Sequence, residues 1–193
     1  MESFAIKLPD RVKMTEDEFY AFCQENDHVR MEKTSQGEII IMAPTGGNTG
    51  RVNKNILFEL ESWNRDMGMG ETFDSSTGFM LPNGAVRSPD ASWIVRSRWE
   101  VLSEDEKKKF PPLCPDFVVE LMSESDALMP AQQKMEEWMN NGCRLAWLIQ
   151  PSEEKVFIYK KGQALKEIKS YSQSLSGEDV LPGFTFDLSW IQK

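Results

Sequence analysis

The sequence predicts an α/β fold of the α+β kind, in which helices flank a mixed β-sheet. One observation is an amphipathic stripe with helical spacing in residues 52–67. A second is a pair of almost continuous apolar runs, 116–121 and 144–151, which are typical of central strands. The third is an alternating pattern near the C-terminus, typical of antiparallel strands. The 193 residues, 40% of them hydrophobic, suit a single domain over residues 1–193.

The N-terminal part predicts a helix followed by a hairpin. Thr15 is a good helix N-cap, and Glu18 three residues later completes a capping box. Residues 29–43 alternate and pass through Gly37, which predicts two antiparallel strands joined by a turn. We therefore expect residues 1–46 to form an N-terminal helix-hairpin extension.

The middle of the chain predicts a long helix and then a meander of strands. The apolar stripe of the helix consists of Val52, Ile56, Leu60, Trp63 and Met67. Gly68 and Gly70 end it. Strand-like pieces follow at 71–74, 78–81 and 90–95, and the charged stretch 97–112 predicts a short helix and a surface loop.

The last part predicts a strand, a helix and further strands. Residues 116–121 read as a central strand, 126–141 as a helix and 144–151 as another buried strand. The core then spans about 47–150, and residues 151–193 form a C-terminal antiparallel extension.

Composition and charge exclude several classes of protein. The net charge of -9 counts against nonspecific coating of a nucleic-acid backbone, although an acidic metal site with a local basic patch is compatible with it. No apolar run approaches the roughly 18–20 residues of a membrane span, and the N-terminus lacks the order of a signal peptide. We expect no membrane partner and a cytoplasmic location.

The sequence also lacks the residues of several common catalytic systems. Cys23, Cys114 and Cys143 have no close pair, so neither a disulfide framework nor a zinc site is predicted. His28 is the single histidine, which argues against histidine-dependent chemistry. No glycine-rich phosphate loop is present, so no nucleotide cofactor is expected.

Two acids have a context that predicts chemistry. Asp90 opens a predicted strand, and Glu120 lies within the apolar run FVVEL. A buried carboxylate is costly unless it is paired, hydrogen-bonded or bound to a metal. If the two strands are neighbours, the carboxylates converge at one end of the sheet, and their oxygens suit Mg²⁺ or Mn²⁺.

Lys134 lies at the edge of the apolar face of the next helix, from which it can reach back toward Glu120. There it could orient a water molecule or stabilise developing charge. The alternative is purely structural: Asp90 caps a turn, and Glu120 pairs with Lys134.

Six short strings occur in a suggestive order: GEIIIMAP, SPDASW, PDFVVELMS, the K-x-x-E-W helix at Lys134, AWLIQP and VLPGF. Together, over residues 15–188, they resemble the Uma-two family of restriction-endonuclease-like proteins, within the PD-(D/E)XK nuclease superfamily. The resemblance implies a restriction-endonuclease-like mixed sheet flanked by helices. It also implies a Mg²⁺-dependent (or Mn²⁺-dependent) endonuclease, a hydrolase acting on ester bonds.

The resemblance also implies roles for individual residues. Asp90 matches the acid of the PD motif and Glu120 the acid of the second motif, so both would bind metal. Met122 stands where the motif has its lysine, and Lys134 matches the place from which this family supplies it instead. Ser123 and Glu38 match further family positions and, with Asn48, are expected to support the site; the alternative for Glu38 is a solvent-facing strand residue.

Three positions depart from the pattern of the family. They are Asn48 in place of a histidine, Pro130 in place of an aspartate and Gln150 in place of an acid. Arg87 is close in sequence to Asp90 and is a candidate contact for phosphate.

The leading interpretation is an endonuclease that acts on DNA, with Asp90, Glu120 and Lys134 as catalytic residues. The first alternative is an inactive nuclease fold that serves as a nucleic-acid-binding or protein-interaction module, which the charge and the departures favour. The second is a metal-dependent hydrolase of a small phosphoester.

A homodimer is also predicted, because both extensions carry apolar residues beyond those that one small sheet needs. These residues are Phe19, Phe22, Ile39, Ile41, Phe157, Tyr159, Phe184, Phe186 and Trp190. The alternative is that both extensions fold back on the core of their own chain.

Overall fold

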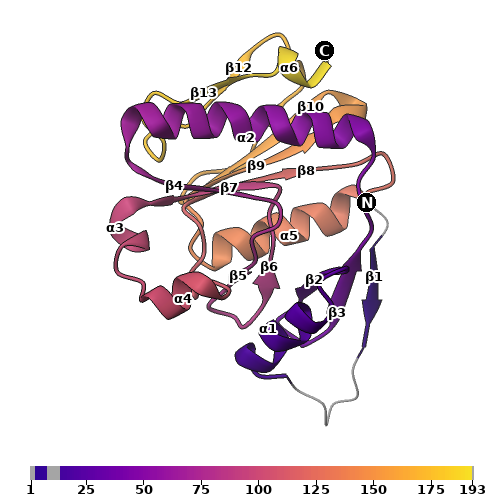
Figure 1. Cartoon of the computed structure of the whole chain (residues 1–193). Helices are drawn as coiled ribbons and strands as arrows, with labels where there is room; N and C mark the ends of the chain where they lie inside the picture. Colours follow the sequence, from indigo (N-terminus) through magenta and orange to yellow (C-terminus); the bar gives the residue numbers. More distant parts are fainter. Residues whose placement is uncertain (1–2, 8–13, 193) are drawn as a thin grey trace.

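The computed structural model describes residues 3–7 and 14–192. Its largest sheet has six strands in the order β11-β10-β9-β8-β7-β4 (Figure 1). In that order they span Lys166–Ile168, Lys155–Lys160, Leu145–Gln150, Phe117–Leu121, Ala91–Val95 and Gly70–Asp74. Strands β8 and β9 run parallel and the other neighbours antiparallel, so the sheet is mixed, as the sequence predicts.

A second sheet has five short strands in the order β1-β3-β2-β6-β5. They span Ser3–Ile6, Ile39–Met42, Arg30–Lys33, Val86–Arg87 and Phe79–Met80. A two-stranded sheet pairs β12 (Ser174–Ser176) with β13 (Thr185–Asp187).

Helices cover both faces of the six-stranded sheet, α2 on one side and α5 on the other (Figure 1). The helices are α1 (Glu16–Glu25), α2 (Gly47–Met67), α3 (Arg96–Trp99), α4 (Glu104–Lys108), α5 (Leu128–Asn140), α6 (Ser189–Gln192) and the 3-10 helix η1 (Pro151–Glu153). Across the residues that the structure describes, none of these helices has the length and apolar character needed to cross a membrane.

Local signals in the sequence place several elements correctly. Thr15 caps α1, and its side chain and that of Glu18 form the reciprocal bonds of a capping box. The turn between β2 and β3 has Gly37 at φ +89°, and α2 ends at Gly68 with φ +61°. Both backbone conformations favour glycine, because a side chain there would be strained.

The predicted meander differs from the structure. β4 pairs directly with β7, whereas β5 leaves the large sheet and pairs with β6 in the second sheet. β6 in turn pairs with β2 of the N-terminal hairpin. Strands of two residues carry too short a pattern to reveal their partners. The four-residue edge strand β1 is not predicted from the sequence either.

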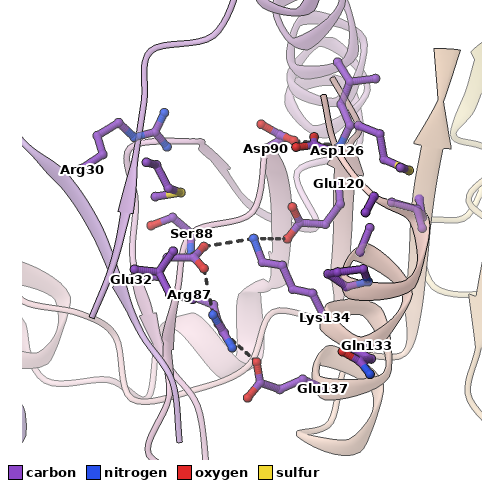
Figure 2. Close-up of a pocket in the computed structure, with 18 of the residues that line it drawn as sticks. Arg30, Glu32, Arg87, Ser88, Asp90, Glu120, Asp126, Gln133, Lys134 and Glu137 are labelled. Carbon is purple, nitrogen blue, oxygen red and sulfur yellow. Dashed lines mark hydrogen bonds and ion pairs between the residues drawn. The ribbon is translucent and has the colours of Figure 1, made fainter. Parts of the chain in front are cut away.

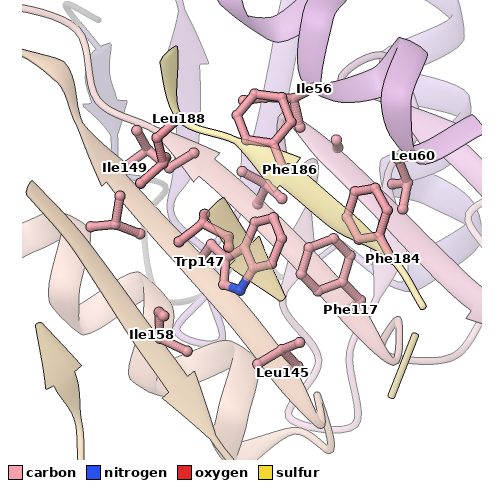
Figure 3. Close-up of a cluster of buried hydrophobic side chains, with 14 of the residues drawn as sticks. Ile56, Leu60, Phe117, Leu145, Trp147, Ile149, Ile158, Phe184, Phe186 and Leu188 are labelled. Carbon is pink, nitrogen blue, oxygen red and sulfur yellow. The ribbon is translucent and has the colours of Figure 1, made fainter. Parts of the chain in front are cut away.

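Two hydrophobic clusters fill the two sides of the large sheet. On the α2 side, Trp147 of β9 stacks on Phe184 of the C-terminal region, with ring centroids 5.8 Å apart (Figure 3). On the α5 side, Val118 of β8 packs with Met135 and Trp138. The sheet is therefore covered on both faces, and its functional groups can reach solvent at the strand ends.

The apolar residues behind the homodimer prediction lie mostly inside the chain's own core. Phe19, Ile39, Phe157, Phe184 and Phe186 are buried, so the extensions fold back on the rest of the chain. The argument for a dimer from surplus apolar surface is therefore wrong for these five side chains.

Candidate active site

A cleft of about 1020 Å³ opens between the hairpin strands β2 and β3 on one side and the end of β8 with α5 on the other (Figure 2). Its charged lining consists of Arg30, Glu32, Arg87, Asp90, Glu120, Asp126, Lys134 and Glu137. Five of these eight are acids, so the cleft is a concentration of negative charge that three cations offset in part.

Asp90 lies at the start of β7, one step beyond the register pair Ala91–Val119, and thus opposite Glu120. Its Oδ1 accepts a hydrogen bond from Asn53 Nδ2 of α2 at 2.8 Å, and its Oδ2 accepts one from the Leu121 N–H at 2.8 Å. These two bonds hold the carboxylate at the end of the sheet, beside the second acid.

Glu120 shares a face of β8 with Val118, which packs on the α5 side. Its Oε1 accepts a hydrogen bond from Trp138 Nε1 at 2.9 Å and pairs with Lys134 Nζ at 2.9 Å. Among the described residues, no hydrogen bond or ion pair engages its Oε2. One oxygen is thus fixed by α5, and the other is available to a ligand.

Lys134 bridges two carboxylates. Its ammonium lies 2.9 Å from Glu120 Oε1 and 3.0 Å from Glu32 Oε1, so it spans the cleft from α5 to the hairpin (Figure 2). Lys134 thus lies on the same side of the sheet as Glu120, whereas Met122, two residues after Glu120, is an uncharged, buried side chain.

Glu32 and Arg87 form the other half of this network. Glu32 is buried, accepts the Ser88 N–H at 2.9 Å and pairs with Arg87 Nη1 at 3.0 Å. Arg87 Nε continues to Glu137 of α5 at 2.6 Å. Arg87 of β6 is therefore held between two acids, and Glu32 of the hairpin is linked to α5 both directly through Lys134 and through Arg87 to Glu137.

The environment shifts the pKa of Glu120, Asp90 and Lys134. Burial raises the pKa of Glu120 to about 7; Lys134 opposes this shift, and the charges of Asp90 and Glu32 add to it. Burial also raises the pKa of Asp90, against the Leu121 N–H and Lys134. Burial alone would lower the pKa of Lys134, but Glu120 and Glu32 outweigh it and hold that pKa above its usual value.

Glu32 is shifted in the opposite direction from Glu120. Burial would raise its pKa, but Lys134, Arg87 and the Ser88 N–H outweigh burial and hold it below the ordinary value. The cations beside Glu32 thus outweigh its burial, whereas at Glu120 and Asp90 burial outweighs the nearby cations.

The structure brings four of the predicted site residues together and separates three others. Asp90, Glu120, Lys134 and Arg87 line the cleft. Asn48 and Ser123 line a smaller cavity of about 410 Å³ instead. Glu38 lines neither of these two cavities and pairs with Lys7 at 3.2 Å. The hairpin acid in the cleft is therefore Glu32, not Glu38.

The three departures from the family pattern lie in different places. Pro130 lines the cleft, and Asn48 lines the smaller cavity. Gln150 lines neither of these cavities; it is buried at the end of β9, where its Nε2 donates to Glu153.

Two residues of the site were missed from the sequence, Glu32 and Asn53. Alternation in β2 places Glu32 on one face with the exposed Arg30, so the sequence predicts a polar face, and only tertiary packing shows that Glu32 is buried. Asn53 has no signal in the sequence either, because a single polar residue in a helix is ordinary. Its Oδ1 is buried and has no hydrogen-bond partner in the described part of the chain.

The donors present can hold a hard cation. Asp90 and Glu120 supply two carboxylates, and the unpartnered amide oxygen of Asn53 lies on a side chain bonded to Asp90. In the described residues no group of three or more His, Cys, Asp or Glu side chains is arranged as a metal site. Two carboxylates suit Mg²⁺, which keeps several waters, better than they suit zinc.

Comparisons with known proteins show the family and the fold of this chain. Residues 16–189 match the family Uma2, described as putative restriction endonuclease. No curated protein matches the chain. Among solved structures, it is similar to the crystal structure of a putative nuclease belonging to DUF820 from Anabaena variabilis. The TM-score is 0.74 at 17% identity, over 92% of this chain and 99% of that chain, which shows a shared fold. Since the family match covers most of its length, this chain belongs to the Uma2 family of nuclease-fold proteins.

Proposed function

We propose that this chain is a metal-dependent endonuclease that hydrolyses phosphodiester bonds of DNA. The observation that supports this most directly is the ammonium of Lys134 at 2.9 Å from Glu120, in the cleft that Asp90 also lines. Hydrolysis of a phosphodiester builds negative charge on phosphate oxygens, and preorganised cations stabilise that charge. The description of the family supports DNA as the substrate.

Asp90 and Glu120 would hold the cation, Mg²⁺ or Mn²⁺. Burial raises the pKa of both carboxylates, and a divalent cation bound there would stabilise their ionised forms. Within the described residues, the Oε2 of Glu120 accepts no hydrogen bond and forms no ion pair, so it can bind a cation. When bound, such a cation activates water and neutralises charge on the phosphodiester.

Lys134 acts in this proposal as a cation and not as a base. Its two carboxylate partners keep it protonated, so it can donate hydrogen bonds to the attacking water or to a phosphate oxygen. Glu32, paired with Arg87, anchors the ammonium from the hairpin side. Asn53 and the Leu121 N–H hold Asp90 at its place.

The test is cleavage of labelled DNA by the purified protein with Mg²⁺ or Mn²⁺. We expect cleavage that a chelator abolishes, and losses of about a hundredfold or more in Asp90→Asn, Glu120→Gln and Lys134→Ala. Glu38→Gln is the matched control, because Glu38 lies outside the cleft, and it should retain the wild-type rate.

Cleavage that survives the chelator, or equal rates in all four variants, would contradict the assignment of the site. No cleavage with either cation would favour the inactive nucleic-acid-binding or interaction module.

A further inference from the structure

The walls of the cleft beside the two acids are apolar on both sides. Ile40 and Met42 of β3 line it from the hairpin, since alternate residues of a strand share one face. Ala127, Pro130 and Ala131 line it from α5 and its N-cap. Two facing apolar walls fit the flat face of a nucleobase better than they fit a sugar-phosphate backbone.

Few cations of the cleft are free to meet phosphates. Arg87 is bonded to Glu32 and Glu137, and Lys134 lies between two carboxylates. Arg30 is exposed, and its guanidinium donates to the carbonyl oxygen of Ser75. Within the described residues, Arg30 is the cation of the lining that has no carboxylate partner.

A single cation without a carboxylate partner suits the phosphates of one DNA strand better than those of a duplex. Duplex binding rests largely on many contacts between cations and phosphates, and the whole chain carries a net charge of -9. The size of the cleft agrees, because about 1020 Å³ is close to the upper end of sites for small ligands, roughly 300–1,000 Å³. A nucleotide or two would fill it.

We propose that the cleft takes unpaired DNA, a single strand or a frayed end, in preference to an intact duplex. A base inserts between the wall of Ile40 and Met42 and the wall that includes Pro130, and Arg30 contacts the phosphate that leads to Asp90 and Glu120. Apolar contact with the face of a base is tolerant of sequence, so little sequence preference is expected. This inference rests on the proposed function and names the substrate class of the same site.

Binding is tested in the Glu120→Gln variant with Mg²⁺ present, so that cleavage does not consume the probe. Fluorescence anisotropy compares a short labelled single-stranded oligodeoxynucleotide with a duplex of equal length. We expect the single strand to bind about tenfold or more tightly than the duplex. Equal or tighter binding of the duplex would overturn the proposal.

The apolar walls are tested by substitutions that make one wall residue polar. In the same background, Met42→Gln and Pro130→Gln should each weaken binding of the single strand about fivefold. Pro130 is exposed in the first turn of α5, so we expect Pro130→Gln to fold. This variant tests the wall even if Met42→Gln impairs folding. Phe58→Gln is the matched control, because Phe58 is 65% exposed on α2 and does not line the cleft, and it should leave binding unchanged.

Failure of this inference can be told apart from failure of the proposed function. Hydrolysis of a small phosphodiester without binding of either oligonucleotide would overturn the single-strand inference and leave phosphodiester chemistry standing. Preferential binding of the single strand without cleavage by the wild type would support the inference and remove the nuclease assignment. Unchanged binding in both wall variants would overturn the proposed mode of base insertion.

Discussion

Lys134 has two carboxylate partners at nearly equal distances, 2.9 Å to Glu120 and 3.0 Å to Glu32. Of these two partners of Lys134, Glu120 is a proposed metal ligand and Glu32 is not, so their proposed roles differ. Glu32 is fixed from three directions by Lys134, Arg87 and the Ser88 N–H, and it is therefore a rigid anchor. We interpret Glu32 as the residue that positions the ammonium.

The prediction for Glu32 follows from this anchoring. Glu32→Gln removes one charge partner of Lys134, and bonds between charged groups of this kind contribute about 1.5–3 kcal/mol. We expect the rate of DNA cleavage to fall about tenfold to a hundredfold and the melting temperature to drop, since Arg87 also loses a partner. Glu38→Gln makes the same chemical change on the same hairpin and should alter neither quantity. A wild-type rate in a folded Glu32→Gln protein would show that Glu32 has no positioning role.

The raised pKa of Glu120 predicts how stability depends on pH. The folded-state pKa is about 7 against an ordinary 4.5, so the folded state binds more protons than the unfolded state between these values. This group therefore contributes a loss of stability as the pH rises through that window. At a pH above this window, the buried, ionised carboxylate lowers the stability of the folded state, and a bound divalent cation would offset that loss.

We therefore expect Mn²⁺ to raise the melting temperature more at about pH 8 than at about pH 5. Glu120→Gln should reduce both the pH dependence and the effect of Mn²⁺, because its amide does not titrate. Thermal melts across this range, with and without the ion, measure both quantities. An equal effect of Mn²⁺ in wild type and variant would mean that the ion stabilises the protein from another place.

At the scale of the elements, Asn64 joins α2 to the large sheet. Its Nδ2 donates to the Gly70 carbonyl oxygen at 2.9 Å, and its Oδ1 accepts the Trp93 Nε1–H at 2.9 Å. The side chain is buried, so each of these partners depends on it. Through β7, this contact also supports the strand that carries Asp90 at its start.

Asn64→Ala should destabilise the protein by about 2–5 kcal/mol, because it leaves two buried polar groups without partners. Asn55→Ala is the control on the same helix, where the hydrogen bond to the Trp190 carbonyl oxygen is exposed, and it should cost less than about 1 kcal/mol. Denaturant unfolding of both variants measures the difference. Similar free energies of unfolding would show that the bridge of Asn64 has little weight.

The sequence predicts long elements well and short ones badly. The capping box of α1, most of the stripe of α2 and the central strands β8 and β9 each carry a local pattern that packing reinforces. Met67, at the end of the predicted stripe, is 48% exposed, and Asn64 is buried in its place. β5 and β6 hold two residues each, and their pairing with the hairpin is decided by tertiary contacts. The site residues differ in the same way. Glu120 can be identified from the sequence because it lies in an apolar run, whereas the role of Glu32 depends on a tertiary contact, the packing of β2 opposite α5.

At the scale of the whole molecule, the N-terminal hairpin is part of the site and not an addition to it. It contributes Glu32 to the ion pairs and Ile40 and Met42 to one wall of the cleft. A homodimer remains a proposal. The apolar residues of the two extensions do not support it, because most of them are buried within the chain. Sedimentation at micromolar concentration, compared with the 22.2 kDa of one chain, decides the assembly state.

Anomalous diffraction from a crystal soaked in Mn²⁺ shows whether Asp90 and Glu120 hold one divalent cation. We expect a single strong anomalous peak in the cleft, about 2.0–2.3 Å from an oxygen of each carboxylate. The two carboxylates should accordingly lie within about 4–6 Å of each other, close enough to share the ion. A peak at any other acidic cluster with none between Asp90 and Glu120, or carboxylates too far apart to share one ion, would rule out a shared metal site at these two acids.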